Sequence, residues 1–135
     1  MNVDRLGIGV ALHYLAGGSK HDPSEYYGKT VFRAWIENEC LKLVLDDSKE
    51  IHIWDDGQSC CEARYMTCDD NPSDLVGGKL VNIEAKEGPE IEGNFGDLHE
   101  QVFVEIATDK GFITVVSHNE HNGYYGGFGL TITEN

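Results

Sequence analysis

The chain has 135 residues, about the length of one domain, and it carries 24 acidic residues against 10 lysines and arginines, a formal net charge of -14. This charge disfavours duplex DNA, RNA and anionic membranes, because binding to those surfaces depends largely on cationic side chains. No apolar stretch approaches the roughly 18 residues of a membrane span. We therefore expect a single soluble domain over residues 1–135, without a signal peptide.

The N-terminal segment, residues 1–29, has no clear pattern because glycines interrupt its apolar residues. Residues 19–28, with a proline and two tyrosines, are typical of a loop. From residue 30 onward most apolar residues alternate with polar ones, which is the pattern of strands with one buried face. We predict strands at 31–36, 41–45, 51–54, 60–68, 80–85, 101–107, 112–117 and 128–133.

Two turns predict antiparallel hairpins. Residues 46–49 connect the strands at 41–45 and 51–54, and residues 108–111 connect those at 101–107 and 112–117, with Gly111 where a positive φ is needed. A short helix is predicted near residues 73–76 or in the N-terminal region. Six to eight antiparallel strands in a domain of this size predict a mainly β fold, either a small antiparallel β-sandwich or a partly closed barrel.

The four cysteines are Cys40, Cys60, Cys61 and Cys68. Without an export signal we expect reduced thiols and a cytoplasmic protein. A disulfide between the adjacent Cys60 and Cys61 would be strained, because neighbouring side chains on a strand point to opposite faces. Unpaired strand edges favour self-association, so a homo-oligomer is compatible with the pattern.

The segment 118–128 lies between two predicted strands, and we interpret it as a connection that carries ligand-binding groups. Its asparagines can hydrogen-bond to a base or a sugar, its tyrosines can stack, and its glycines let backbone amides approach a ligand. The same residues would also suit a tight bulged hairpin with the tyrosines in the core. Both interpretations stay open.

Arg64 is the one arginine among other potential binding groups, and its guanidinium could hold a phosphate. An ion pair with Glu62, Asp69 or Asp70 is the competing interpretation. Together the two regions give the predicted ligand-binding residues, which are Arg64, Tyr65, His118, Asn119, His121, Asn122, Gly123, Tyr124, Tyr125 and Gly126. We predict no catalytic residue, no cofactor and no metal ligand.

A zinc site is the alternative for the histidines. His118 and His121 could join His99 and a carboxylate, Glu100 or Glu120, and zinc needs three or four such ligands. Two histidines at this spacing share one side only in a helix, which the segment does not predict. A cysteine nucleophile would need Cys60 or Cys61 beside a histidine.

Two blocks of sequence carry a family resemblance. The first is Gly57-Gln58-Ser59-Cys60-Cys61-Glu62, followed by residues 77–78 and 81–84; the second runs from residues 108–111 through His118-Asn119 to Asn122-Gly123-Tyr124-Tyr125-Gly126-Gly127. Over residues 54–133 the chain resembles a small family of uncharacterised proteins of tailed phages and bacteria. The resemblance implies no activity. It implies that both blocks are important and that the protein acts in a phage setting, in the host cytoplasm.

The leading functional hypothesis is non-enzymatic binding and sequestration of a small polar ligand. A cyclic nucleotide immune signal is the favoured ligand, which would make the protein an anti-defence sponge. One alternative is an acidic protein-interaction module that blocks a host factor by charge complementarity. Another is a metal-dependent hydrolase built on histidines.

Overall fold

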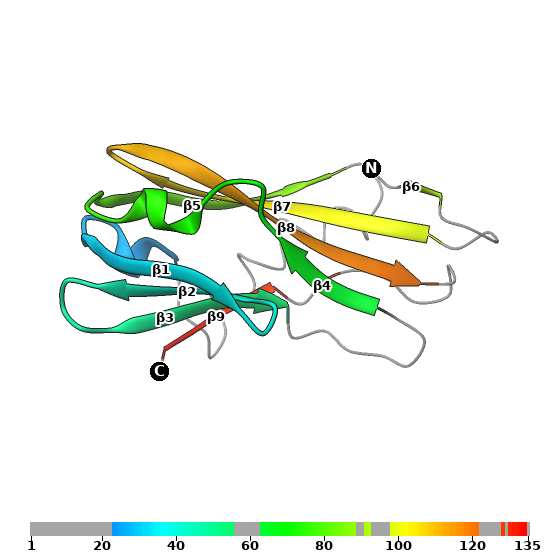
Figure 1. Ribbon diagram of the computed structural model, residues 1–135, viewed down its shortest axis with the longest axis horizontal. Helices are drawn as coiled ribbons and strands as arrows, with labels where there is room; N and C mark the ends of the chain where they lie inside the picture. Colours follow the sequence, from blue (N-terminus) through cyan, green and yellow to red (C-terminus); the bar gives the residue numbers. More distant parts are fainter. Residues whose placement is uncertain are drawn as a thin grey trace.

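A computed structural model of the chain describes residues 23–55, 63–88, 91–92, 98–121, 128 and 130–134. These residues form β-strands and two short 3-10 helices, labelled in Figure 1. The helices are η1 (Pro23–Tyr26) and η2 (Pro72–Leu75); the strands are β1 (Val31–Glu37), β2 (Cys40–Leu45), β3 (Glu50–Asp55), β4 (Ala63–Thr67), β5 (Leu80–Glu87), β6 (Ile91–Glu92), β7 (Leu98–Thr108), β8 (Gly111–His121) and β9 (Leu130–Glu134).

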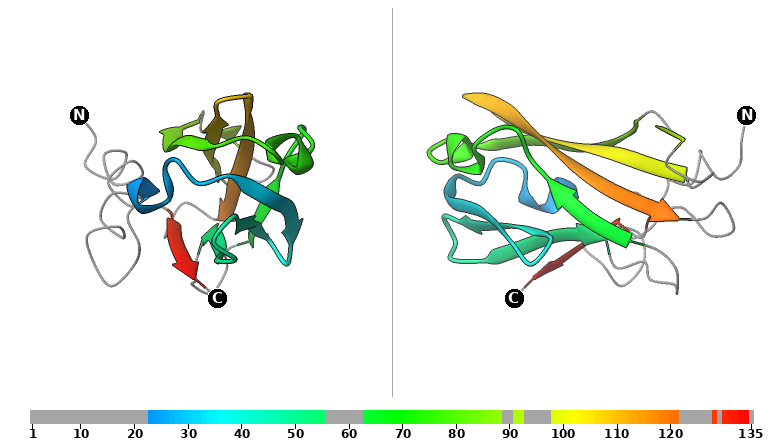
Figure 2. Two further views of the ribbon diagram at one scale, coloured as in Figure 1. Left: turned by 90° about the vertical axis from the view of Figure 1, so that its left-hand side faces the viewer. Right: turned by 45° about the vertical axis from the view of Figure 1, so that its right-hand side comes forward.

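The strands form two antiparallel sheets. The first has the order β1-β2-β3-β9, and the second has the order β4-β8-β7-β5, with β6 beside β7. Figures 1 and 2 show the sheets as two layers facing each other. The predicted mainly β fold is therefore confirmed, and of the two predicted architectures it is the sandwich that forms.

The two sheets are joined at one corner. Thr30 and Lys79 form an isolated antiparallel bridge, and the backbone of Val31 accepts from Gly77 and donates to Gly78. A side chain at position 78 would meet the Thr108 side chain at 2.4 Å, so only glycine allows this close approach. The corner holds the sheets together without closing them into a barrel.

Both predicted hairpins are confirmed. In the first, Leu41 pairs with Ile53 and Leu43 with Ile51. In the second, the pairing of β7 with β8 continues for eleven residues from the turn, where Gly111 has φ +146°. The alternating pattern and the turn residues were sufficient to specify these pairs.

Three local predictions change. Residues 23–26 form the helix η1 inside a stretch predicted as loop, whereas the helix predicted near 73–76 is η2, one residue earlier. The Asn71 side chain accepts from the backbone of Ser73 and caps η2. The largest change is that β8 continues to His121, so residues 118–121 are strand and not connection. Polar residues at inward positions concealed this extension.

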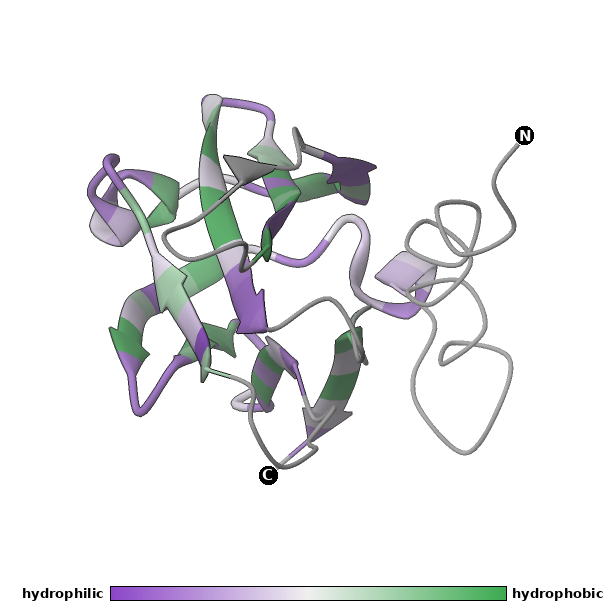
Figure 3. Ribbon diagram, turned by 90° about the vertical axis from the view of Figure 1, so that its right-hand side faces the viewer, coloured by the Kyte–Doolittle hydropathy of each residue, from purple (hydrophilic) through white to green (hydrophobic). Residues whose placement is uncertain are grey.

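Alternating side chains build the core between the sheets. Figure 3 shows hydrophobic and hydrophilic positions alternating along the strands. The buried apolar residues include Leu43, Ile51, Val104, Ile106 and Val115. Toward the end of β8 the inward positions become polar, with Ser117, Asn119 and His121 all buried. The apolar core therefore gives way to a polar end, and the predicted site residues lie there.

Among the described residues no helix is long and apolar enough to cross a membrane. Cys40 and Cys68 are free thiols, and burial raises the pKa of Cys40 to about 11. Cys60 and Cys61, like the predicted N-terminal segment up to residue 22, lie outside the described residues.

Candidate functional site

Strand alternation divides the predicted site residues between the two faces of the second sheet. Arg64 pairs with Asn119 and Tyr65 pairs with His118 across β4 and β8. Asn119 and His121 are buried on the inner face, whereas His118 lies on the outer face. Arg64, Asn119 and His121 therefore do not share a surface with Tyr65 and His118. The other predicted residues, Asn122, Gly123, Tyr124, Tyr125 and Gly126, lie outside the described residues.

On the inner face, Arg64 forms an ion pair with Asp55 of the opposite sheet. Its Nη1 lies 2.8 Å from Oδ2 and 3.1 Å from Oδ1 of Asp55, and the two side chains are 15% and 9% exposed. The competing interpretation, that Arg64 forms an ion pair, is confirmed, although Asp55 was not among the partners considered. The ion pair joins β4 to β3, and the role of Arg64 as a phosphate ligand stays a prediction.

A second buried pair of hydrogen-bonded side chains lies on the same face. His121 Nε2 is 2.8 Å from Glu100 Oε1, with side chains 3% and 13% exposed. Buried polar side chains are stable when they are hydrogen-bonded, and removing one partner leaves the other without that bond. These two contacts on the inner face therefore contribute to the stability of the fold.

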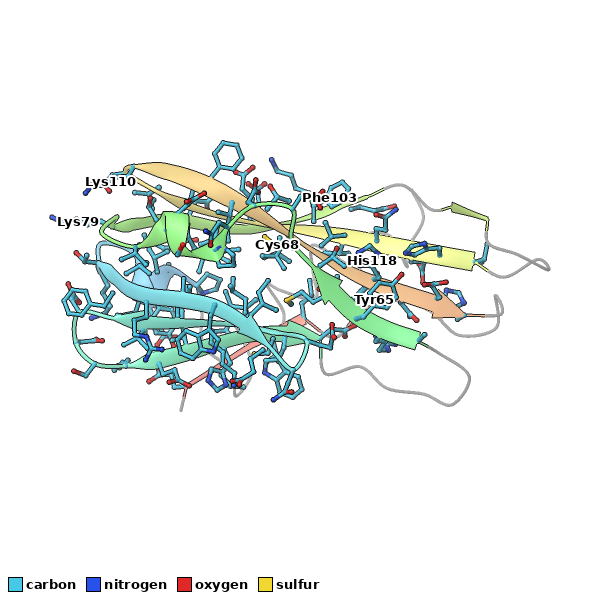
Figure 4. The ribbon with its side chains drawn as sticks, in the orientation of Figure 1. Tyr65, Cys68, Lys79, Phe103, Lys110 and His118 are labelled. Carbon is cyan, nitrogen blue, oxygen red and sulfur yellow. The ribbon has the colours of Figure 1, made fainter. Side chains whose placement is uncertain are left out.

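The outer face carries five side chains that we call the imidazole–phenol cluster: Tyr65, Thr67, His99, His118 and Glu120. The rings of Tyr65 and His118 are stacked, with centroids 4.5 Å apart and planes 9° from parallel. The His99 ring lies 5.0 Å from that of His118. Figure 4 shows Tyr65 and His118 side by side where β4 runs along β8.

Hydrogen bonds fix each member of the cluster. Thr67 Oγ1 lies 2.7 Å from His118 Nε2, and His118 Nδ1 lies 2.8 Å from His99 Nε2. The Tyr65 hydroxyl donates to Glu120 Oε2 at 2.5 Å. The result is a continuous chain from the Thr67 hydroxyl through two imidazoles, with a phenol–carboxylate pair beside it.

The surroundings shift two pKa values in this cluster. The hydrogen bond to Glu120, together with burial and the charge of that carboxylate, raises the pKa of Tyr65 to about 12. Burial, followed by the neighbouring His99, lowers the pKa of His118, while Glu120 and Glu39 act in the opposite direction. His118 is therefore a neutral imidazole at pH 7, with one nitrogen free of a proton.

The zinc arrangement weighed from the sequence is not assembled. His118 and His121 lie on opposite faces of β8, so they cannot hold one ion together. Within the described part of the chain, no three histidine, cysteine, aspartate or glutamate side chains form a group that could hold a metal ion. A hydrolase that relies on those histidines as joint ligands therefore has no support here.

Sequence reasoning missed Thr67 and considered His99 and Glu120 only as metal ligands. The pairing register of the predicted hairpin contained enough information to place these residues. Continuing its register from the 108–111 turn places His99 opposite Glu120 and Gln101 opposite His118, as the structure has them. Beginning the first predicted strand at 101 and ending the second at 117 removed those pairs from consideration.

Comparison with known proteins identifies a family. Residues 24–129 match the family model described as Domain of unknown function (DUF7448), and the chain belongs to that family. The match begins thirty residues before the region in which a resemblance was expected. No curated protein and no solved structure matches the chain.

Proposed function

We propose that this member of the DUF7448 family binds a small polar ligand with a planar ring at the imidazole–phenol cluster and holds it without cleaving it. The observation that carries the proposal is the parallel stack of Tyr65 and His118 on the outer face of the second sheet. Both side chains are only partly buried. Stacking on an aromatic ring contributes about 1–3 kcal/mol per base in proteins that bind single-stranded nucleic acids.

Hydrogen bonds within the protein hold the side chains of the cluster in place. The phenol is held by Glu120 and the His118 ring by Thr67 and His99. A ligand that binds side chains already fixed in place loses less of its interaction energy to ordering them. This arrangement supports a binding surface more than a chance contact of rings.

A cyclic nucleotide is the ligand class that we favour. Its base would stack beside Tyr65, and the exposed Glu120 carboxylate would accept from N–H groups on the base edge. The Thr67 hydroxyl and the imidazoles would hydrogen-bond to sugar and phosphate. A cyclic phosphodiester carries one negative charge, so a protein of net charge -14 repels it less than a triphosphate.

Sequestration of such a signal would make the protein a sponge that protects a phage in the host cytoplasm. Calorimetry of the full chain with a panel of cyclic nucleotides tests the binding. We expect micromolar or tighter affinity for at least one, a loss of about tenfold or more in Tyr65→Ala and His118→Ala, and recovery of the ligand chemically intact.

His52→Ala is the matched control, because His52 also contacts a carboxylate, Glu50, but lies in the other sheet. The affinity of His52→Ala for the cyclic nucleotide should equal that of the unmodified protein. Absence of binding by the folded protein at micromolar concentration, or equal binding by Tyr65→Ala, would refute the proposal.

A specific observation also favours the second candidate, an acidic protein-interaction module. Glu84 and Glu105 lie directly opposite each other on β5 and β7. Like charges in that position are destabilising. A basic partner would relieve this repulsion, and Phe112, which is 63% exposed at the start of β8, could add apolar contact.

A further inference from the structure

We infer that the Thr67 hydroxyl is an activated nucleophile that accepts an acyl group, with His118 as its base and His99 as the residue that positions His118. This inference goes beyond ligand binding, because it assigns a covalent step to the cluster. It rests on the geometry of three consecutive groups in the outer face of the second sheet.

The distances are those of a nucleophile and its base. A general base must lie about 2.6–3.2 Å from the atom whose proton it takes, and His118 Nε2 lies 2.7 Å from Thr67 Oγ1. A third group usually orients the base. Here His99 Nε2 lies 2.8 Å from the other nitrogen of His118.

Thr67 is accessible to a reagent. It is exposed at the end of β4, and β4 ends the strand order of its sheet. A substrate can therefore approach the hydroxyl from solvent while His118, stacked against Tyr65, stays in position. A buried hydroxyl in the same hydrogen bond would have no such access.

The protonation state fits the role of a base. His118 is neutral at pH 7, and when its proton is on Nδ1 it donates to His99 and leaves the Nε2 lone pair directed at Thr67. The charged groups around it are Glu120 on the same strand and Glu39 from the turn between β1 and β2. Both carboxylates stabilise the imidazolium that forms when His118 takes the proton.

With an activated ester, the Thr67 hydroxyl displaces the leaving group at the acyl carbon. Thr67 Oγ1 forms a bond to the carbonyl carbon, and its proton passes to His118 Nε2. The bond from that carbon to the leaving oxygen breaks, and the leaving oxygen departs with the electron pair. His118 returns the proton to the leaving oxygen when an alcohol departs, or releases it to solvent when a phenolate departs. The products are an O-acyl threonine and that alcohol or phenolate, and no oxidant, reductant or metal is consumed.

Acetylation of the full chain by p-nitrophenyl acetate tests the inference. We expect one rapid equivalent of p-nitrophenolate per chain, with the acetyl group on Thr67 in peptide mass spectra. Thr67→Ala should lose the rapid phase and Thr67→Ser should keep it. Thr114→Ala is the matched control, since Thr114 lies on the neighbouring strand opposite Glu105, and it should react normally.

The histidines give separate readouts. His118→Ala should slow the rapid phase about 100-fold or more. His99→Ala should slow it less and move its pH profile upward, because loss of His99 removes one cause of the lowered pKa of His118; His99→Gln should restore part of the rate. A residue with only a structural role would not move the pH profile.

An acetyl group on lysine or histidine but not on Thr67, or an unchanged rapid phase in folded Thr67→Ala, would overturn the inference. Nucleotide affinity of Thr67→Ser, measured separately, distinguishes this failure from that of the binding proposal. Normal binding without acylation would remove the nucleophile alone, and acylation without binding would remove the ligand proposal alone.

Discussion

Neighbouring side chains on β8 have different roles because successive residues of a strand face opposite sides of a sheet. Asn119 is fully buried, whereas His118 and Glu120 face outward, toward Tyr65 and His99. A run of four polar residues therefore supplies both a structural contact and a candidate binding surface. The pair of Tyr65 and Glu120 is the part of that surface whose electrostatics can be measured directly.

Alkaline titration should reveal this pair. The pKa of Tyr65 is raised to about 12 in the folded chain, against about 10 for a free tyrosine. The unfolded state therefore releases its proton first, so the contribution of Tyr65 to stability is complete below pH 10 and is lost as the pH rises toward 12. Glu120→Gln should lower the pKa of Tyr65 in an ultraviolet absorbance titration of tyrosinate.

Glu134→Gln is the control, because Glu134 accepts a hydrogen bond from a different tyrosine, Tyr26. It should leave the titration of Tyr65 unchanged. Identical Tyr65 titration in Glu120→Gln and the unmodified protein would contradict the hydrogen bond.

At the scale of elements, the two sheets are joined at both ends. The corner at Thr30 and Lys79 joins them through backbone contacts, and the pair of Asp55 and Arg64 joins β3 to β4 at the other end. The second joint lies beside the strand ends that carry the imidazole–phenol cluster. It thus fixes the position of β4, and with it Tyr65 and Thr67.

Breaking that ion pair should destabilise the fold. Arg64→Met removes the guanidinium that lies 2.8 Å from the buried Asp55 carboxylate, and losing one partner of a buried ion pair costs about 3 kcal/mol or more of stability. The double variant Arg64→Met with Asp55→Leu should recover more than half of the loss, because both charges of this ion pair are then removed. Urea unfolding measures both.

Lys86→Met provides the comparison, since Lys86 is 54% exposed and its Nζ lies 3.9 Å from Glu105 Oε2. This substitution should lower the free energy of unfolding by less than about 1 kcal/mol. Equal losses in Arg64→Met and Lys86→Met would show that the joint between the sheets contributes little.

At the scale of the whole molecule, the charge of -14 acts on every partner. It repels anions at long range and attracts basic polypeptides, and salt screens both effects over about 8 Å at physiological ionic strength. A ligand that depends on stacking and hydrogen bonds should therefore respond weakly to salt. A basic protein partner should respond strongly.

An oligo-arginine peptide of defined sequence should separate the two candidate functions. If the acidic face binds proteins, the affinity for this peptide should fall as sodium chloride is added. Glu84→Gln should then weaken binding and raise the thermal midpoint, because it removes the repulsion with Glu105. Asp74→Asn, on η2, is the control for a simple change of net charge. Equal effects of the two variants on affinity would leave only a general charge effect and contradict a specific docking face.

The sequence by itself was sufficient for the mainly β class, most strands and both hairpins. Alternation identifies one buried face per strand, and Gly111 with its neighbours determines which strands are adjacent. These are local properties, so residues close in sequence contain the necessary information. The same local rules began β7 too late, at 101, and ended β8 too early, at 117, because polar residues such as Glu100 and Asn119 occupy inward positions outside those limits.

Only the tertiary structure decided which predicted site residues lie together. Face and pairing depend on where each strand begins and on which strand lies beside it, and a shift of one residue moves every side chain to the other face. Arg64 and Tyr65 are adjacent in sequence, yet Arg64 holds Asp55 of the opposite sheet while Tyr65 stacks on His118. Such contacts between different strands follow from the pairing and packing of the sheets, which no local pattern records.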